Sequence, residues 1–449
     1  MKILFIYPTR LDISGRPVKF KKAFLPPLNL STLCSLTPDK HDTRIINDCV
    51  EDIDFELDCD VVCITAITTQ STRAYQIAGK FRSKGKKVIL GGVHPTMKAD
   101  EAKLHADAVV IGEAENIWEQ ILVDCENNQL KELYRADDIF DMNRLIIPRW
   151  DSANLDIYYR SFGRKMPRMP IYTTRGCVHD CMYCSVSKFF GRTYRFKPIE
   201  NVIQEIDATA AESYFFVDDN LICKHDYTEE LLRAIKPKGI WWFSQASVRL
   251  AKQPHLIEMA AQSGCKGLLL GVESLSKDTL KGLKKSWNKP EMYKELFDRL
   301  KRAKIRPWAS IMFGLDEDDP ESLTKTVDLL LSWDVHCIII WILTPLPGTD
   351  LYQKMDTQGR ITIRDWSKYD CNHVVFQPKH FSQEELNDFF WSTYRRLHSV
   401  PAIFKKAKLS VKTGYHPVKD FINGLLFHSR IRKKIMQYDH PFSMGLGKL

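Results

Sequence analysis

The sequence predicts an α/β protein with a doubly wound, Rossmann-like N-terminal domain, a partial (β/α)6 barrel of the TIM type, and a mainly helical C-terminal region. The first reason is that short Val/Ile-rich runs alternate with amphipathic segments up to about Gly359, which is typical of parallel sheets covered by helices. The second reason is length, because 449 residues exceed one ordinary domain and suffice for at least two hydrophobic cores.

Composition is that of a soluble globular protein, with 44% hydrophobic and 27% charged residues. No apolar run approaches the ~20 residues of a membrane span. Met1 leads directly into a strand pattern, without the charged head and cleavage site of a signal peptide. The twelve cysteines show no compact disulfide spacing, which suits a reducing compartment. We therefore expect a cytoplasmic protein.

The N-terminal domain is predicted from strand-like runs separated by helical segments, of which Ala74–Ser83 is the clearest. The runs are Lys2–Tyr7, Thr43–Asn47, Asp60–Ala66, Lys87–Leu90 and Ala108–Ile111. Turns rich in Gly, Pro and Thr follow the carboxyl ends of these strands, the edge at which open α/β sheets bind ligands. No G-x-G-x-x-G motif follows the first strand, which disfavours a nicotinamide or flavin dinucleotide.

Three segments of this domain resemble the cobalamin-binding domain that precedes the radical SAM domain in one large subfamily. They are Pro26-Pro27-Leu28, Gly91-Gly92-Val93-His94-Pro95-Thr96 and Gly112-Glu113-Ala114-Glu115. The resemblance implies cobalamin contacts from Pro27, Thr68, Gly91, Gly92, His94, Gly112 and Glu113. Asp48-Cys49-Val50-Glu51-Asp52 lacks the histidine of the Asp-x-His-x-x-Gly motif, so the resemblance implies a cobalt whose lower face is free of protein histidine. The alternative is an unliganded Rossmann-like domain.

Residues 125–169 show no hydrophobic periodicity and are polar, with prolines at intervals, which indicates a linker. We accordingly expect an N-terminal domain over residues 1–124, a barrel over 170–359 and a helical, basic region over 360–449.

A loop with three closely spaced cysteines opens the barrel, just after the strand-like Met169–Tyr172. Cys177, Cys181 and Cys184 have the spacing C-x3-C-x2-C, which lets their sulfur atoms point into one small volume. An iron–sulfur cube held by only three thiolates keeps one iron open for a substrate or cofactor, whereas a structural zinc site needs four ligands. A zinc knuckle that borrows His179 or a distant cysteine, or three unrelated thiols, are the alternatives.

The cysteine loop matches the cluster signature of the radical SAM superfamily, and Tyr183 before the last cysteine also fits it. In that family the open iron of a [4Fe–4S] cluster binds the amino and carboxylate groups of S-adenosyl-L-methionine. Gly271-Val272-Glu273-Ser274 and Phe313-Gly314-Leu315 resemble the motifs that hold its ribose and adenine, which implicates Glu273, Ser274 and Gly314. Gln245 and Arg249 are candidates for the methionine carboxylate, although Arg249 is as well explained by pairing with a core carboxylate.

Six strand candidates make up the partial barrel, whose reactive face lies at the carboxyl strand ends. They are Pro170–Thr173, Ser213–Val217, Gly239–Gln245, Gly267–Gly271, Arg306–Phe313 and Cys337–Leu343. Asp218 and Asp219 follow the second strand as helix caps or substrate contacts.

The C-terminal region begins with a capping box, Ser382-Gln383-Glu384-Glu385, that opens a helix with a largely apolar face. We expect that face to close the open side of the barrel. Much of the net charge of +9 lies further on, around the apolar stretch Phe421–Phe427. This pairing indicates either a peripheral membrane contact or a solvated basic helix packed on its own domain.

The two resemblances together imply a cobalamin-dependent radical SAM enzyme, most often a methyltransferase that acts on an unactivated carbon. The family chemistry uses a 5′-deoxyadenosyl radical to remove hydrogen from the substrate and methylcobalamin to supply the methyl group. From this resemblance we expect the substrate to be a secondary metabolite, lipid or tetrapyrrole and the electron donor to be a flavodoxin or ferredoxin, and we expect no nucleic acid partner. The alternatives are a radical cyclisation, oxidation or rearrangement without methyl transfer, and, more remotely, a zinc-knuckle protein that binds nucleic acid.

Overall fold

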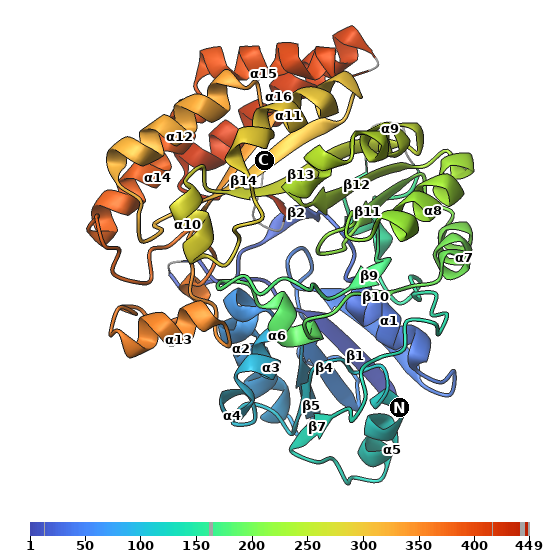
Figure 1. Cartoon of the computed structure of the whole chain (residues 1–449). Coiled ribbons are helices and arrows are strands. Elements are labelled where there is room, and N and C mark those ends of the chain that lie inside the picture. Colours follow the sequence, from blue (N-terminus) through green and yellow to red (C-terminus); the bar gives the residue numbers. More distant parts are fainter. Residues whose placement is uncertain (13, 161–164, 415, 441–444, 448–449) are drawn as a thin grey trace.

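The computed structural model describes residues 1–449 except 13, 161–164, 415, 441–444 and 448–449. Figure 1 shows the N-terminal domain in blue below the green and yellow barrel, with the orange and red C-terminal helices packed along the barrel's other side. The α/β fold class with parallel sheets and a helical C-terminal region is confirmed.

The N-terminal sheet has six parallel strands in the order β3-β1-β4-β5-β6-β7. Alternate residues of β1 (Lys2–Tyr7) face opposite sides of this sheet, so Leu4 and Ile6 join one core and Ile3 and Phe5 join the other. The chain order reverses between β1 and β4 (Val61–Thr65), which makes the carboxyl edge of these two strands the topological switch point.

All five strands predicted for this domain, and the predicted helix, lie within a few residues of β1, β3, β4, β5, β6 and α2, whereas the strands β2 and β7 were missed. The remaining strands are β2 (Phe20–Ala23), β3 (Asp42–Asn47), β5 (Lys87–Gly91), β6 (Ala108–Ile111) and β7 (Leu133–Arg135). The helices are α1 (Leu28–Leu36), η1 (Thr68–Gln70), α2 (Ser71–Arg82), α3 (Val93–Met97), α4 (Ala99–Ala102), α5 (Trp118–Glu126) and η2 (Leu155–Ile157). Strand β7 lies inside the segment expected to be linker, so the N-terminal sheet extends further along the chain than the pattern indicates.

The barrel sheet is parallel and runs in chain order, β8-β11-β12-β13-β14-β15. Its strands are β8 (Met169–Ile171), β11 (Ser213–Phe216), β12 (Trp241–Ala246), β13 (Cys265–Glu273), β14 (Arg306–Phe313) and β15 (Cys337–Ile342), with a small antiparallel ribbon of β9 (Thr174–Arg175) and β10 (Arg195–Phe196). Its helices are α6 (Val186–Phe190), α7 (Ile199–Thr209), α8 (His225–Ile235), η3 (Lys236–Lys238), η4 (Val248–Lys252), α9 (Pro254–Gln262), α10 (Lys277–Gly282), η5 (Pro290–Met292), α11 (Tyr293–Arg302), α12 (Pro320–Ser332) and α13 (Asp350–Thr357).

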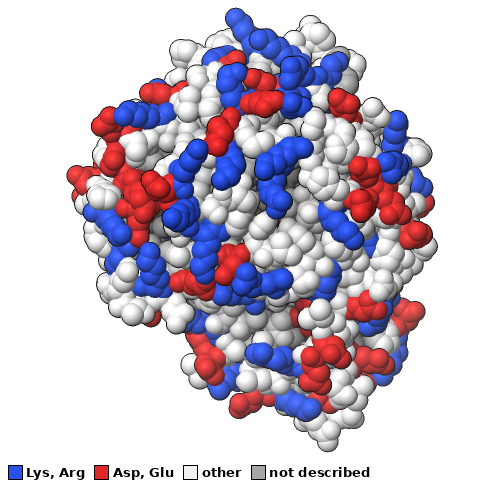
Figure 2. Space-filling model, viewed as in Figure 1, with Lys and Arg blue, Asp and Glu red and all other residues white. Residues whose placement is uncertain are grey.

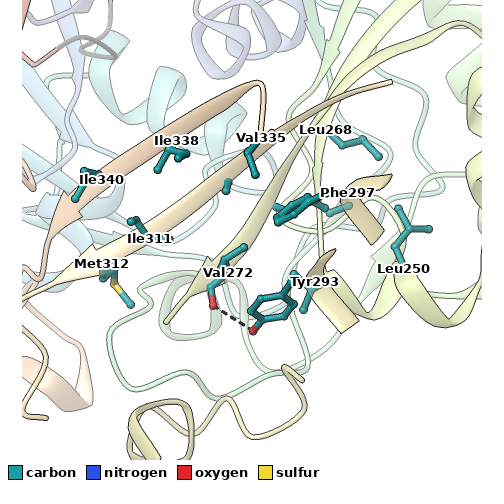
Figure 3. Close-up of a cluster of buried hydrophobic side chains, with 14 of the residues drawn as sticks. Leu250, Leu268, Val272, Tyr293, Phe297, Ile311, Met312, Val335, Ile338 and Ile340 are labelled. Carbon is teal, nitrogen blue, oxygen red and sulfur yellow. Dashed lines mark hydrogen bonds between the residues drawn. The ribbon is translucent and has the colours of Figure 1, made fainter. Parts of the chain in front are cut away.

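The barrel core is shown in Figure 3, where side chains from β13, β14 and β15 pack with Tyr293 and Phe297 of α11. The Tyr293 hydroxyl donates a hydrogen bond of 3.4 Å to the Val272 carbonyl, near the end of β13. This contact ties the strand end just before Glu273 to the helix layer.

The C-terminal helices are α14 (Gln383–Leu397), α15 (Val400–Lys412) and α16 (Pro417–Met436), preceded by η6 (Trp366–Lys368) and followed by β16 (Gly445–Gly447), which pairs with β2. The predicted capping box opens α14, since Ser382 and Glu385 exchange hydrogen bonds with each other's backbone N–H groups. The buried Tyr394 hydroxyl lies 2.9 Å from both the N–H and the carbonyl oxygen of Ile340. Helix α14 therefore covers the outer edge of β15, as expected for a helix that closes the barrel. In the part of the chain that the structure describes, no helix is both long and apolar enough to cross a membrane.

Candidate functional site

The cysteine loop follows the carboxyl end of β8 and runs from β9 into α6. Cys177, Cys181 and Cys184 are half-buried and form no disulfides. Burial, with a smaller contribution from the neighbouring cysteines of the trio, raises the pKa of Cys181 to about 11 and that of Cys184 to about 12. All three cysteines lie on the one short loop between β9 and α6.

This donor set fits an iron–sulfur cube, in which each thiolate binds a different iron and the sulfur atoms need not converge on one point. Across the described ranges, no three His, Cys, Asp or Glu side chains converge closely enough to hold a single metal ion. Because the ligands must be thiolates and burial favours the thiols, cluster assembly itself has to drive their deprotonation.

Asp218 holds the segment that leads into the cysteine loop. Its carboxylate, 1% exposed, accepts hydrogen bonds from the Thr173 N–H at 3.0 Å and the hydroxyls of Thr173 and Thr174 at 2.8 and 2.6 Å, and also from the Thr174 N–H. Asp218 is therefore a positioning residue and does not cap a helix. Gly176 comes next with φ +86°, and a Cβ there would lie 2.3 Å from the Thr193 carbonyl oxygen, so the loop needs glycine at this position.

Two ring systems flank the cysteines. The Tyr194 hydroxyl lies 3.5 Å from the Cys177 sulfur and accepts a hydrogen bond of 3.3 Å from the Asn220 amide. His179, the residue that a zinc knuckle would use, stacks on Trp287 with ring centroids 3.9 Å apart. Burial lowers the pKa of His179, and so do the charges of Arg249 and Lys285, which shows that both cations lie close to the loop.

Glu273 reaches the same loop from the end of β13, where its φ of +62° is unusual for a side chain other than glycine. Its carboxylate pairs with Lys285 at 2.6 Å, and the same ammonium lies 3.2 Å from the Tyr183 hydroxyl. The structure thus brings Glu273 next to the cysteine loop, but it already has a cationic partner that the sequence did not indicate.

The other residues predicted to contact S-adenosylmethionine lie at neighbouring strand ends. Gln245 is the half-buried penultimate residue of β12, and Arg249 is exposed on η4 with no ion pair among the described residues. The Ser274 hydroxyl accepts a hydrogen bond of 3.1 Å from the Ser276 N–H. Gln245 and Glu273 thus lie at the carboxyl ends of the neighbouring strands β12 and β13, and Arg249 follows β12 on η4.

Gly314 lies in the turn that follows β14. Its N–H and that of Leu315 both donate to the Asp318 carboxylate, at 3.0 and 2.9 Å. A Cβ at Gly314 would lie 2.7 Å from Leu386 of α14. Backbone N–H groups at this turn are therefore already engaged, so an adenine contact here would use the Gly314 carbonyl or the apolar wall.

A cavity of about 490 Å³ lies between the two domains. One wall consists of the carboxyl strand ends around the switch point together with residues 25–33, and the other consists of barrel residues near the cysteine loop, among them Tyr172, Phe189 and Phe190. Gly92 has φ +97°, and a Cβ there would lie 2.8 Å from the Thr65 hydroxyl, which explains the glycine in this tight turn. No histidine occurs among the described residues that line the cavity.

Pro27, Gly91, Gly92, Gly112 and Glu113 line this cavity, as the resemblance to cobalamin-binding domains implies. An open apolar space at the switch point, without a competing histidine, fits a corrin ring. Thr68 and His94, the other two predicted contacts, are not among the lining residues.

His94 points into the domain instead. Its ring is fully buried, its Nε2 lies 3.4 Å from the Glu101 carboxylate, and it packs edge-on against Trp366 with centroids 5.4 Å apart. Trp366 donates to the same carboxylate at 3.0 Å. This cluster links α3 and α4 to η6, so packing and polar contacts account for the histidine in the turn. Thr68 is likewise buried, and its carbonyl accepts a hydrogen bond from the Ser71 hydroxyl.

Asp219 faces the cavity from the barrel side, next to the fully engaged Asp218. Burial and the neighbouring Asp218 charge raise its pKa to about 7. No hydrogen bond to its carboxylate occurs within the described residues, so it remains available to a bound molecule.

Sequence reasoning missed Lys285, Tyr194 and Arg175 as parts of this site. Only Arg175 could have been recognised from the sequence, since it stands two residues before the first cysteine and its charge is opposite to that of the glutamates of Gly112–Glu115. Lys285 and Tyr194 are brought to the cysteines by the fold, and nothing in their local pattern marks them.

Comparison with known proteins agrees with the geometry. Residues 22–122 match the B12 binding domain and residues 171–330 match the radical SAM superfamily. The chain is 31% identical over 389 residues to bacteriochlorophyllide d C-12(1)-methyltransferase of Chlorobaculum tepidum, covering 85% of this chain and 84% of that enzyme. It is 29% identical over 433 residues to the bacteriochlorophyllide d C-8(2)-methyltransferase of the same organism, covering 93% and 94%.

The fold is also found among solved structures. The radical S-adenosylmethionine methyltransferase TsrM from Kitasatospora setae, with cobalamin and a [4Fe–4S] cluster bound, aligns with a TM-score of 0.65. The alignment covers 97% of this chain and 99% of that one at 14% sequence identity, a likeness of fold.

Proposed function

The chain belongs to the cobalamin-dependent radical SAM methyltransferases, and from this membership we propose that it methylates a carbon atom of a bacteriochlorophyllide-like tetrapyrrole. The observation that carries the substrate class is that two relatives matched over most of their own length both act on bacteriochlorophyllide d. Aromatic side chains on the barrel side of the cavity, Tyr172, Phe189 and Phe190, supply the flat apolar surface that suits a macrocycle.

The enzyme uses a [4Fe–4S] cluster, S-adenosylmethionine and cobalamin. When bound, the first two supply hydrogen abstraction from an unreactive carbon and cobalamin supplies the methyl group. We assign the cluster to Cys177, Cys181 and Cys184, and S-adenosylmethionine to the surrounding residues Gln245, Arg249, Glu273, Ser274 and Gly314. The cobalamin residues we propose are Pro27, Gly91, Gly92 and Gly112. Thr68, His94 and Glu113 remain predictions, because the side chains of His94 and Glu113 have other partners and Thr68 does not line the cavity.

The chain's own residues bind, orient and exclude water. Asp218 fixes the strand that enters the cysteine loop, and Lys285 holds the Glu273 carboxylate beside it. Asp219, which faces the cavity without a partner in the described residues, is the side chain we propose to accept a hydrogen bond from the bound tetrapyrrole. Protein groups thus set positions, and no protein nucleophile is needed.

The test is anaerobic incubation of the reconstituted enzyme with a bacteriochlorophyllide, S-adenosylmethionine and a low-potential reductant. The expected product gains the mass of one CH2 unit for each S-adenosylhomocysteine formed. A product of altered ring structure, with S-adenosylhomocysteine at background, would instead indicate the cyclisation or rearrangement. No product from any tetrapyrrole, with turnover of a lipid, would refute the substrate class.

We propose that an acidic, low-potential electron carrier of the flavodoxin or ferredoxin type docks at a basic rim around the cysteine loop. Lys284 and Arg192 lie within 3.2 and 3.6 Å of the loop residue Asp180, and their side chains are exposed. Lys188 of α6 pairs with Asp350 nearby. Reversing the charge of Arg192 and Lys284 should slow cluster reduction by flavodoxin but not by dithionite, and equal rates with both reductants would contradict this docking site.

We also propose that α15 and α16 contact an anionic membrane surface, from which a lipophilic tetrapyrrole is taken up. Val418, Ile422 and Leu426 form an exposed apolar stripe at i, i+4 and i+8 on α16, and Val400 and Phe404 are exposed on α15. Exposed cations flank these side chains: Lys405, Lys408, Lys412, Lys419, Arg430 and Lys433. Figure 2 shows Lys and Arg gathered along the upper edge, over these helices.

The charge balance favours an anionic bilayer over a second protein surface of mixed charge. Asp420 is the only acidic residue of the two helices, and its carboxylate is paired with Arg306 at 3.2 Å. In a sedimentation assay the protein should bind phosphatidylglycerol vesicles and lose binding as salt rises. Ile422→Ser with Leu426→Ser should weaken binding, whereas the control Leu104→Ser, at an exposed apolar residue of the N-terminal domain, should not. Equal binding by both variants would refute the proposed surface.

A further inference from the structure

Arg175, directly before Gly176 and Cys177, reaches from the cysteine loop into the N-terminal domain. Its guanidinium pairs through Nη1 with the Glu113 carboxylate and through Nη2 with the Glu115 carboxylate at 2.6 Å. All three side chains are nearly buried, at 11%, 8% and 10% exposure. The two glutamates belong to the Gly112–Glu115 turn, which follows β6 and lines the cavity.

A second arginine completes the network from the same ribbon. Arg195 lies opposite Arg175 in the β9–β10 pair, and its Nη1 lies 2.8 Å from the other Glu113 oxygen and 2.9 Å from the Phe140 carbonyl. Two guanidinium groups of the barrel thus neutralise two carboxylates of the cobalamin-binding domain. The charges balance inside a nearly dry contact, although Nε and Nη2 of Arg195 are buried without a hydrogen-bond partner among the described residues. Removing one member of the network would therefore leave an uncompensated buried charge.

The geometry requires arginine at this position. A planar guanidinium can engage two carboxylates at once from its separate nitrogens, whereas a lysine ammonium is a single point charge. Arg175 also lies over the Tyr172 ring at 4.4 Å and near the Phe140 ring at 5.2 Å, which restrains it further. Both Glu113 oxygens and one Glu115 oxygen are occupied by these partners, so the acidic turn serves the domain contact.

We propose that Arg175, Glu113 and Glu115 are positioning residues that fix the cysteine loop against the cobalamin-binding edge and so set the separation and orientation of the two bound cofactors. The proposal rests on the assignment of cluster and cobalamin to their two domains but not on the identity of the substrate. The contact joins the cluster loop directly to the cavity wall through Arg175 and the two glutamates. Residues 125–169 add a separate apolar contact, in which Phe140 packs with Tyr172 and Leu28.

The separation matters for the reaction because a displacement of about 1 Å between reacting groups can cost on the order of 100-fold in rate. A contact that holds the cluster loop beside its first cysteine limits this displacement at the cluster itself. The network thus keeps both cofactors at a fixed distance from the reacting atom of the substrate.

The test compares Arg175→Gln, Arg175→Lys and Glu115→Gln with the control Arg360→Gln, each loaded with cluster and cobalamin. Arg360 pairs with Asp316 at 2.8 Å, with 13% and 15% of the two side chains exposed, so its loss matches the burial and charge change of Arg175→Gln at a site outside the domain contact. Iron and cobalamin contents are measured first. Pulsed electron paramagnetic resonance then measures the distance distribution between cob(II)alamin and the reduced cluster.

The wild-type protein and Arg360→Gln should give one narrow distance distribution. The distribution should broaden or shift in Arg175→Lys and Glu115→Gln, and more so in Arg175→Gln, while iron and cobalamin contents stay at the wild-type level. Arg175→Lys keeps the positive charge and therefore tests the simultaneous pairing of one guanidinium with two carboxylates, even where Arg175→Gln does not fold.

Two results would overturn the proposal. One is an unchanged distance distribution in fully loaded Arg175→Lys and Glu115→Gln. The other is loss of cobalamin from Glu115→Gln with an unchanged distribution in Arg175→Lys, which would assign the carboxylates to cofactor binding. Neither readout depends on turnover, so a wrong substrate assignment leaves this test intact.

Discussion

Removal of the Asp218 carboxylate tests how the cysteine loop is held. Asp218→Ala deprives four donors of their acceptor, namely the N–H and hydroxyl groups of Thr173 and Thr174. The two hydroxyls can rotate to other acceptors, but the two buried N–H groups lose theirs, at about 1–3 kcal/mol each. We therefore expect the free energy of unfolding to fall by about 2–6 kcal/mol.

Asp218→Asn separates charge from hydrogen bonding. Most of the contacts go to one carboxylate oxygen, which an asparagine oxygen can replace. The charge-assisted part of each bond is lost, but burial raises the pKa of Asp218 above its ordinary value, so a neutral side chain also avoids a desolvation cost. The two effects oppose each other, and we expect a loss of about 1–2 kcal/mol.

The assay combines urea unfolding of the metal-free protein with iron content after anaerobic reconstitution. Asp218→Ala should lower both the urea midpoint and the iron content, whereas Asp218→Asn should keep nearly all of its iron. Glu205→Gln is the control, because it removes a buried carboxylate paired with Lys197 at 2.6 Å that does not hold the loop. Its stability should fall without loss of iron. Wild-type iron content in Asp218→Ala would refute the positioning role.

Three further predictions concern other parts of the site. Replacing Cys177, Cys181 and Cys184 with alanine should abolish iron binding and leave the circular dichroism spectrum unchanged, and retained iron in the triple variant would rule out the assignment. Burial raises the pKa of Asp318 from 3.8 to about 7, so the folded state binds more protons than the unfolded state between these pH values. The free energy of unfolding should therefore fall as pH rises from about 4 to 7, by at most about 1.4 kcal/mol per pH unit. The urea midpoint of the wild-type protein should show this fall and that of Asp318→Asn should not; parallel pH curves for the two proteins would contradict the prediction. The cob(II)alamin spectrum should show no axial nitrogen hyperfine splitting, because His94 is turned away from the cavity; splitting that disappears in His94→Ala would contradict the structure.

Much of the fold was predictable because the informative signals are local. Continuous apolar runs such as Cys337–Leu343 coincide with buried parallel strands to within one residue, since a strand covered on both faces needs apolar side chains throughout. The capping box at Ser382 and the cysteine spacing are equally local, and each needs only four to eight neighbouring residues. Strand β7 was missed because three residues, with one buried, leave too little pattern to detect.

The candidate site was predictable only where its residues stand beside a recognisable motif. Glu273 was found through its strand-end motif, but its partner Lys285 lies twelve residues away, and their pairing depends on how α10 folds back. His94 was chosen from a turn that does line the cavity at Gly92, yet its own side chain points inwards to Glu101. Side-chain direction within a short helix follows from tertiary packing, which the local sequence does not contain.

The hydroxyl of Tyr394 has a consequence for how the newly made chain is protected. A neighbouring strand would pair with the N–H and carbonyl of Ile340, and the Tyr394 phenol contacts both, with His440 Nε2 also 3.2 Å from the carbonyl oxygen. Until α14 has been synthesised and docked, this part of the β15 edge is open to the strand of another chain. Docking of α14 therefore ends the period in which this edge of the nascent barrel is prone to aggregate, and a chain that stops before α14 would remain exposed to that hazard.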